Sequence, residues 1–262
     1  MTSPFLERLR AGEKTLMLGI RASRTTDVVR MAASTGHHAI LVDLEHSAMS
    51  VQTATELCAA AHDLGLRAFV RAPERDYGVI GRLLDGGAHG IVAPRVESSA
   101  EASMLARACR FPPDGQRSQL ASLPMYGMRP TPARILNPAA NASTVVQVIV
   151  ETPAGVDAAD EIAAVDGVDI LVMGANDFTA ELGRPGDHGH PDVRDAVAIV
   201  AQACQRHGKL FMLAGIGDRA TYDSLAALGA CPLLLTGMDS ELLYSAMQQR
   251  AESLLTAPEK TP

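Results

Sequence analysis

Eight short apolar segments divide the chain, and stretches with apolar residues at helical spacing separate them. The short segments are typical of buried strands, because they are rich in Val, Ile and Leu and are bounded by polar residues or Gly. Strands are predicted at Thr15–Ile20, His38–Leu44, Arg67–Ala72, Gly90–Arg95, Val145–Glu151, Asp169–Gly174, Leu210–Ala214 and Leu233–Gly237. Helices are predicted near residues 25–35, 50–63, 76–85, 98–110, 154–164, 191–207 and 217–228, with a last one from Asp239 onward.

This alternation predicts an α/β fold with a parallel sheet. Many of the helices pass to the next strand through a Gly at the position of a helix C-cap, such as Gly36, Gly65 and Gly208. Strands that alternate with helices indicate βαβ units, and about eight units make a (β/α)8 barrel, the TIM barrel. A doubly wound sheet is the alternative, but the sequence contains no GxGxxG or P-loop motif. We therefore predict a barrel.

One domain is expected to span residues 1–262, because barrels of this size are often undivided. The regular pattern is interrupted around residues 112–143, which are rich in Pro, Ser, Arg and Asn. Connections of this length are usually functional or disordered, so we expect an irregular insertion that lies over the catalytic end or contacts another subunit. A short tail is expected from about residue 256.

The composition is that of a soluble enzyme. The chain is 47% apolar and has a net charge of −7. An acidic chain without a basic run is not expected to bind nucleic acid or a membrane surface, and no apolar run is long enough to span a membrane. The four cysteines lack CxxC spacing, which argues against disulfides and a thiolate zinc site. The N-terminus lacks the pattern of a signal peptide, so a cytoplasmic location is expected.

Polar side chains cluster where three predicted strands end. Asp43, Glu45 and His46 follow the second strand, Glu151 ends the fifth, and Asp177 follows the sixth. Ligands of barrel enzymes bind at the C-terminal ends of the strands. The sequence therefore predicts an active site at this end.

Glu151 and Asp177 are predicted to hold a divalent metal ion. They follow consecutive strands, and two carboxylates with waters and a chelating substrate suit Mg²⁺ or Mn²⁺. Gln147 lies four residues before Glu151, on the same face of the strand, where it can contact a ligand on the metal. The alternative is that Glu151 caps a helix and Asp177 begins a short one.

Asp43 and His46 are predicted to form an acid–base pair in which the carboxylate orients the imidazole. Glu45 is expected to order water near the metal. Asp85 is expected either to support the His46 pair or to be a carboxylate at the C-terminal end of a helix. Arg71 ends the third strand, where its guanidinium can bind an oxo acid or neutralise an enolate. A turn-capping role for His46 and a structural ion pair for Arg71 with Asp43 or Glu45 are the alternatives.

The three lysines exclude one mechanism. Lys14 and Lys209 precede predicted strands, at the end opposite the site, and Lys260 lies in the tail. A Schiff-base aldolase needs a desolvated lysine in its active site, so carbanion chemistry here would have to be metal-stabilised.

The pair His188 and His190 looks like a metal-binding tract, but His-Pro before a helical pattern is more typical of a helix-entry turn.

The sequence resembles the HpcH/HpaI family of class II pyruvate aldolases over most of its length. The motifs that carry the resemblance are Asp43-Leu-Glu-His46, Val70-Arg71, Leu83-Leu-Asp85-Gly-Gly87, Pro94-Arg-Val96, Phe111-Pro-Pro113 with Gly115-Gln-Arg117, Gln147-Val-Ile-Val-Glu151-Thr, Gly167-Val-Asp169 and Gly174-Ala-Asn-Asp177. The family includes aldolases for 4-hydroxy-2-oxoheptanedioate and 2-dehydro-3-deoxyglucarate, and its barrel is of the phosphoenolpyruvate/pyruvate superfamily type.

The resemblance implies roles for the site residues. Glu151 and Asp177 would hold the metal ion (Mg²⁺, Mn²⁺ or Co²⁺), and Gln147 and Arg71 would contact pyruvate. Asp43 and His46 would transfer a proton. The backbone amides of Gly174, Ala175, Asn176 and Asp177 would hold the pyruvate carboxylate. The resemblance also implies a homo-hexamer, a trimer of dimers with a swapped C-terminal helix.

The chain departs from the family pattern at three places, all bearing on the acceptor. Gly115-Gln-Arg-Ser118 stands where Gly-x-Arg-Gly is usual, Gly174-Ala-Asn-Asp177 where Gly-Pro-x-Asp is usual, and Met212-Leu-Ala-Gly-Ile-Gly217 where Gly-Ile-Leu is usual. The expected activity is reversible cleavage of a 4-hydroxy-2-oxo acid to pyruvate or hydroxypyruvate and an aldehyde, through a metal-stabilised enolate. An acyl-CoA lyase of the citrate lyase β or malyl-CoA type and a non-catalytic oxo-acid-binding protein are the alternatives.

Overall fold

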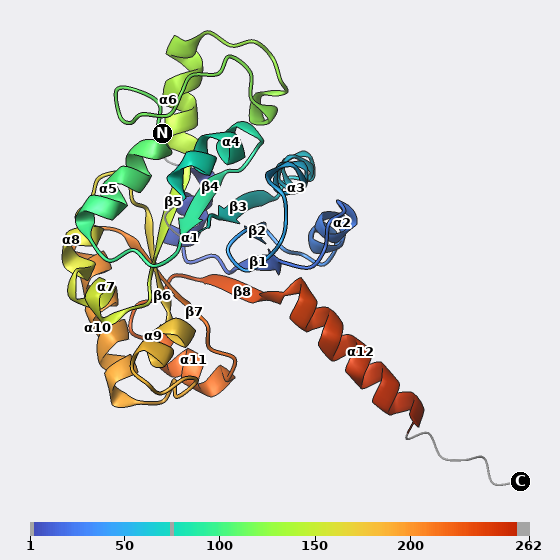
Figure 1. Cartoon of the computed structure of the whole chain (residues 1–262), viewed down its shortest axis with the longest axis vertical. Helices are drawn as coiled ribbons and strands as arrows, with labels where there is room; N and C mark the ends of the chain where they lie inside the picture. Colours follow the sequence, from blue (N-terminus) through green and yellow to red (C-terminus); the bar gives the residue numbers. More distant parts are fainter. Residues whose placement is uncertain (1–2, 74–75, 256–262) are drawn as a thin grey trace, which may run out of the picture.

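Eight parallel strands form one sheet in a near-closed barrel, as predicted (Figure 1). The computed structural model describes residues 3–73 and 76–255. The strands neighbour one another in the order β7-β6-β5-β4-β3-β2-β1-β8. Their bounds are β1 Thr15–Ile20, β2 Ala39–Asp43, β3 Arg67–Arg71, β4 Gly90–Ala93, β5 Val145–Val150, β6 Ile170–Gly174, β7 Leu210–Ala214 and β8 Leu233–Met238.

The seam of the barrel lies between β7 and β8. These two strands end the order of the sheet, and the described residues form no ladder between them. A single backbone hydrogen bond crosses close to β8, from Cys231 N to Phe211 O at 2.7 Å. On the other side of β8, its register with β1 shifts between Met17 and Gly19. The barrel is therefore nearly closed, with its last strand bonded on one side.

Alternating side chains of the strands separate two apolar layers. Met17, Leu41, Phe69, Ile149 and Val172 belong to one buried cluster, which fills the barrel. Their sequence neighbours pack outward, in a second cluster shared with the helices. Because side chains alternate along a strand, the residue two positions beyond an inward apolar residue also points inward. This parity decides which polar residues enter the site.

Helices cover the outside of the barrel, most of them where the sequence predicts one (Figure 1). Their bounds are α2 Asp27–Ser34, α3 Val51–Asp63, η1 Tyr77–Val79, α4 Ile80–Asp85, α5 Ser99–Ala108, α7 Pro153–Asp157, α8 Ala159–Ala163, α9 Ala175–Glu181, α10 Pro191–Arg206, α11 Arg219–Ala226 and α12 Asp239–Leu255. No described helix is both long and apolar enough to cross a membrane.

An N-terminal helix that the sequence pattern did not predict closes one end of the barrel. In α1, Pro4–Arg10, the side chains of Phe5, Leu6 and Leu9 are buried with the barrel interior. The rings of Phe5 and Phe69 are 4.8 Å apart between centroids. A helix of seven residues is too short to show a helical period.

The insertion predicted around residues 112–143 is not irregular throughout. It contains the short helix η2, Pro124–Tyr126, and ends in α6, Ala133–Ser143. Its side chains form a separate apolar cluster of Phe111, Leu123, Leu136 and Ala140. Pro and Asn inside α6 hid the helical pattern, because both disfavour a helix interior. The tail predicted from about residue 256 lies outside the described residues.

The C-terminal helix stands away from the barrel. α12 begins directly after β8 and extends outward, and none of its residues is buried (Figure 1). Its exposed apolar side chains include Leu243, Tyr244, Met247 and Leu254. Among the residues that the structure describes, no helix that follows β8 therefore packs over it, as one ordinarily would in a barrel (Figure 1).

Candidate active site

Asp43 and Arg71 form a buried ion pair at the ends of neighbouring strands. The β2–β3 register places the two residues side by side, and both point inward because Leu41 and Phe69 do. Arg71 Nε donates to Asp43 Oδ1 at 3.0 Å, and Nη2 donates to Oδ2 at 2.7 Å. Burial alone would raise the pKa of Asp43, but the hydrogen bonds and charge of Arg71 lead the opposing effects and hold it below its ordinary value. Asp43 is therefore an anion that fixes the Arg71 guanidinium.

The structure does not pair Asp43 with the imidazole of His46. Asp43 Oδ1 accepts hydrogen bonds from the backbone N–H groups of Glu45 and His46, at 3.1 and 3.2 Å. Arg71 and Arg21 donate to the same carboxylate, so no lone pair is left to orient the ring. The carboxylate nearest the imidazole is instead Glu45, whose Oε2 is 3.6 Å from His46 Nε2. The prediction that Asp43 orients the ring is therefore wrong in this structure.

Glu45 connects His46 to Arg71. Its Oε2 is also 3.1 Å from Arg71 Nη1. Burial raises the pKa of Glu45, and the charges of Asp43 and Asp177 act in the same direction, whereas Arg71 and His46 oppose them. The His46 ring is half-exposed. A group that is accessible and next to a carboxylate can exchange protons with a ligand.

Glu151 and Asp177 lie at the ends of neighbouring strands β5 and β6. Val150 is in register with Met173, so Glu151 comes beside Gly174, and Asp177 lies in the first turn of α9. A Cβ on Gly174 would come within 2.7 Å of Glu151 Oε2. The glycine is required here because the carboxylate occupies the space of a side chain.

Glu151 is buried and electrostatically unfavourable as an anion. Burial is the main cause that raises its pKa, to about 7, with repulsion by Asp177 and Glu45 adding to it. One hydrogen bond opposes this shift, from Arg95 N to Glu151 Oε1 at 2.8 Å. Arg95 adopts a left-handed φ of 50°, uncommon for a residue other than glycine. Strained backbone that aims a donor at a buried carboxylate is typical of a functional site.

Gln147 is a buried amide without a donor partner. It is 1% exposed, and in the described part of the chain Nε2 has no acceptor. It points into a cavity of about 210 Å³ at this end of the barrel. Leaving such a group unpaired costs about 1–3 kcal/mol, so the amide is suited to a bound polar ligand.

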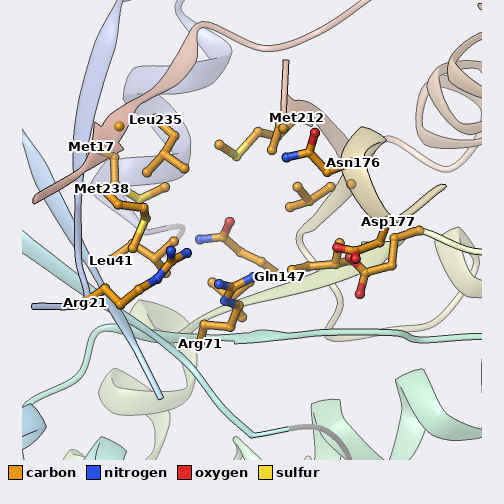
Figure 2. Close-up of a pocket in the computed structure, with 18 of the residues that line it drawn as sticks. Met17, Arg21, Leu41, Arg71, Gln147, Asn176, Asp177, Met212, Leu235 and Met238 are labelled. Atoms are coloured by element: carbon orange, nitrogen blue, oxygen red, sulfur yellow. The ribbon is translucent and has the colours of Figure 1, made fainter. Parts of the chain in front are cut away.

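The cavity combines an apolar floor with charged walls (Figure 2). Its polar lining is Arg21, Arg71, Gln147, Glu151, Asn176, Asp177 and Glu241, and its apolar lining includes Met17, Leu41, Ile149, Met212, Leu235 and Met238. Figure 2 shows Arg21 and Arg71 reaching toward the amide of Gln147, with Asp177 on the opposite side. Most of the predicted binding residues are thus brought together.

Five of the predicted residues do not line the cavity. Asp43, Glu45, His46 and Ala175 are outside its lining, although Asp43 and Glu45 both contact Arg71, which lines it. Asp85 ends α4, where it accepts a hydrogen bond from Arg117 Nη2 at 2.7 Å, so it does not support His46. The structure agrees with the alternative interpretation of Asp85 as a carboxylate at the C-terminal end of a helix, where it pairs with the buried Arg117 of the insertion.

The sequence reading missed other residues of the site. Arg21 follows β1, Glu241 lies in the first turn of α12, and both line the cavity. His188 Nε2 lies 2.9 Å from Asn176 Oδ1, whereas His190 caps α10, as the helix-entry interpretation expected. The strand-end rule that found the other residues would also have found Arg21. Glu241 carries no local signal, and His188 was interpreted together with His190 as part of a helix-entry turn.

The lysine prediction is confirmed for the described residues. Lys209 Nζ donates to Val165 O and Val168 O, at 3.0 and 2.8 Å, and so stabilises the end of the barrel opposite the cavity. Lys14 precedes β1 at the same end, and Lys260 lies outside the described residues. Neither Lys14 nor Lys209, the two lysines that the structure describes, lines the cavity.

Comparisons with known proteins agree with this geometry. The sequence model of the HpcH/HpaI aldolase/citrate lyase family matches residues 20–222. A 4-hydroxy-4-methyl-2-oxoglutarate aldolase of Hapsidospora irregularis is 38% identical over 229 residues, which are 86% of this chain and 85% of that protein. A 2-keto-3-deoxy-L-rhamnonate aldolase of Shigella sonnei is 30% identical over 95% of this chain and 92% of its own length. The crystal structure of an HpcH/HpaI aldolase from Desulfitobacterium hafniense covers all of both chains, with a TM-score of 0.90 and 27% identity. This chain therefore belongs to the HpcH/HpaI aldolase/citrate lyase family.

Proposed function

We propose that the protein is a metal-dependent aldolase that reversibly cleaves a 4-hydroxy-2-oxo acid to pyruvate, or hydroxypyruvate, and a second carbonyl compound. The observation that carries this proposal is the pair Glu151 and Asp177 at neighbouring strand ends, where burial and mutual repulsion raise the pKa of Glu151 to about 7. The relatives support it, because both are named as aldolases of 2-oxo acids.

The residues present fit a divalent cation. Two carboxylates that repel each other are stabilised by a positive ion, and oxygen ligands suit Mg²⁺, Mn²⁺ or Co²⁺. The described residues contain no group of three or more His, Cys, Asp or Glu side chains placed to hold a metal ion. Glu151 and Asp177 would therefore share the ion with the substrate and water. When bound, the ion would act as a Lewis acid toward the 2-oxo acid and so favour its enolate.

Side chains around this pair are placed to bind the oxo acid. Gln147 offers its unpaired Nε2 hydrogens, and Arg71, held in orientation by Asp43, offers a fixed positive charge. We assign the carboxylate of the oxo acid to the backbone amides of Gly174–Asp177, because first-turn amides of a helix lack intrahelical acceptors. Donors fixed before the substrate binds stabilise negative charge that develops on it.

We assign proton transfer at the C4 oxygen to His46. In the cleavage direction this oxygen loses its proton as the C3–C4 bond breaks, and in the addition direction it regains one. The imidazole is accessible and lies beside Glu45, which is therefore the carboxylate we assign to orienting it. Asp43 acts through Arg71 in this scheme, as its anchor.

We further propose that the protein assembles through α12, as a hexamer built from dimers that exchange this helix. The support is that α12 buries none of its residues while its apolar side chains are exposed. Next to β8 there is a cavity of about 650 Å³, whose lining includes Leu16, Tyr222 and Leu234. Light scattering should give the mass of six chains, and a chain that ends after Ser240 should give a smaller mass. An unchanged mass would contradict the exchange.

The enolate step provides the test of function. The protein should exchange the methyl protons of pyruvate with solvent deuterium, lose this activity on exhaustive chelation, and regain it with Mg²⁺, Mn²⁺ or Co²⁺. Glu151→Gln and Asp177→Asn should abolish exchange, whereas the surface change Asp160→Asn should not. Exchange that survives exhaustive chelation would refute the metal-dependent mechanism.

A further inference from the structure

Arg21 is a second guanidinium in the cavity that the mechanism above does not use. It follows β1 directly and lines the cavity on the side of Met17 and Met238 (Figure 2). Its Nε donates to Asp43 Oδ2 at 3.1 Å, and its backbone N donates to Asp239 Oδ1 at 2.8 Å. The side chain and the backbone are thus both held in place, from β2 and from α12.

The charge of Arg21 is only partly neutralised. Asp43 carries one negative charge but serves two guanidinium groups, and Arg71 makes the closer, two-pronged pair with it. Asp239 binds the backbone of Arg21, and the second carboxylate beside the guanidinium is Glu241, whose Oε1 is 3.9 Å from Nη1, beyond hydrogen-bond distance, and which is largely exposed. Within the described ranges, neither Nη1 nor Nη2 of Arg21 makes a hydrogen bond. An Arg with both terminal nitrogens available can bind a carboxylate with two parallel hydrogen bonds.

The position of Arg21 relates it to one half of the substrate. Of the residues assigned to pyruvate, Gln147 lies within β5 and Asp177 lies in the first turn of α9, after β6. Arg21 lies across the cavity from Asp177 (Figure 2). In a 4-hydroxy-2-oxo acid, carbons 1 to 3 come from pyruvate, and carbon 4 with its substituents comes from the acceptor. A substituent on carbon 4 that points away from the metal ligands therefore approaches Arg21.

We propose that Arg21 binds a carboxylate on the acceptor, so that the preferred acceptor is itself a 2-oxo acid such as pyruvate or glyoxylate. This inference rests on the proposed aldolase function and specifies its substrate class. In the addition direction, carbon 3 of the enolate attacks the acceptor's keto carbon, one C–C bond forms, and the keto oxygen takes up a proton. The product is a 4-hydroxy-2-oxo acid with a second carboxylate on carbon 4. Arg21 touches that carboxylate and takes no part in proton transfer.

The test compares two small acceptors that differ in charge. Glyoxylate carries a carboxylate next to its aldehyde, and glycolaldehyde carries a neutral CH₂OH there. The measured quantity is the ratio of kcat/KM for glyoxylate to kcat/KM for glycolaldehyde, with pyruvate as donor. In Arg21→Gln we expect this ratio to fall by about 10- to 100-fold, since hydrogen bonds between charged groups contribute about 1.5–3 kcal/mol. Arg21→Lys should give an intermediate ratio, because it keeps the charge without the planar fork.

Controls separate this inference from the proposed function. Arg30→Gln, an exposed arginine on α2, should leave the ratio at the wild-type value. Using a ratio cancels any general loss of activity caused by disturbing Asp43. If wild type neither exchanges pyruvate protons nor adds pyruvate to either acceptor, the aldolase proposal itself fails. If exchange and addition proceed but the ratio is the same in wild type, Arg21→Gln and Arg21→Lys, the aldolase stands and the role of Arg21 is refuted.

Discussion

Protons and metal ions compete for Glu151, so the metal affinity of this site should change in a pH range where an ordinary glutamate is fully ionised. Burial, with Asp177 and Glu45 adding to it, raises the pKa of Glu151 to about 7. When a side chain must lose a proton to bind a metal ion, the apparent dissociation constant of the metal rises by the factor 1 + 10^(pKa − pH). That factor is about 11 at pH 6 and about 1.1 at pH 8, a tenfold difference worth about 1.4 kcal/mol. At the ordinary pKa of 4.5, the change would be only about 3%.

The assay is calorimetric titration of metal-free protein with Mn²⁺ at pH 6, 7 and 8 and constant ionic strength. We expect the dissociation constant to rise by about tenfold from pH 8 to pH 6. Asp160→Asn, a change of an exposed carboxylate, should reproduce the wild-type curve. A dissociation constant that is the same at pH 6 and pH 8 would refute the reasoning, because a buried carboxylate ligand cannot be indifferent to protons in this range.

The metal-free protein gives a second measurement of the same pKa. The folded-state pKa of Glu151 is raised above its unfolded value, so its contribution to stability is fully present below about pH 4.5 and is lost as the pH rises through 7. Between pH 8 and pH 6 the contribution grows by about 1.3 kcal/mol. With chelator present, the free energy of unfolding of wild type minus that of Glu151→Gln should grow by this amount from pH 8 to pH 6. The difference between the two proteins is needed because His89, which is buried and neutral, makes the folded protein less stable over the same fall in pH.

Three further predictions test other parts of the structure. Gly174→Ala should lower metal-dependent pyruvate exchange by at least about tenfold, because its Cβ would come within 2.7 Å of Glu151 Oε2, whereas Gly81→Ala, which meets no atom within 4 Å, should not. Burial lowers the pKa of His89 to about 3, so its neutral ring in the folded state costs stability as the pH falls. From pH 8 to pH 5, the free energy of unfolding of wild type should fall by about 2 kcal/mol more than that of His89→Asn. Equal pH dependence of the two proteins in chemical denaturation would contradict this. Arg71→Lys should slow pyruvate exchange by at least about tenfold although it keeps the charge, and a change in melting temperature alone would make Arg71 structural.

The strands were predictable because the barrel buries them on both faces. β2, Ala39–Asp43, and β6, Ile170–Gly174, have apolar residues at nearly every position, a pattern that few other structures produce. The same pattern located the C-terminal ends of the strands. Most of the candidate site residues were then predicted from their positions at these ends. Gln147, Glu151 and Asp177 were found in this way, because their place depends only on strand direction and side-chain alternation.

Contacts between distant segments could not be read from the sequence. The spacing of Asp43 and His46 predicted a dyad, but whether their side chains meet depends on Arg21 and Arg71, which occupy the carboxylate. α1 and α6 gave no clear signal, since one is too short and the other contains Pro and Asn. Glu241 reaches the cavity only because β8 returns beside β1.

The division of the cavity between two sets of strands has a consequence for how this enzyme can diversify. The pyruvate half depends on β5 and β6, where the register and the missing side chain of Gly174 leave little freedom for substitution. The acceptor half depends on Arg21, after β1, and on Met238, at the end of β8, the strand that is bonded on one side only. Substitutions there can change which carbonyl compound is accepted without altering how the enolate is formed. Selection or directed evolution for new acceptors is therefore expected to accumulate changes around the seam of the barrel and to leave β5 and β6 untouched.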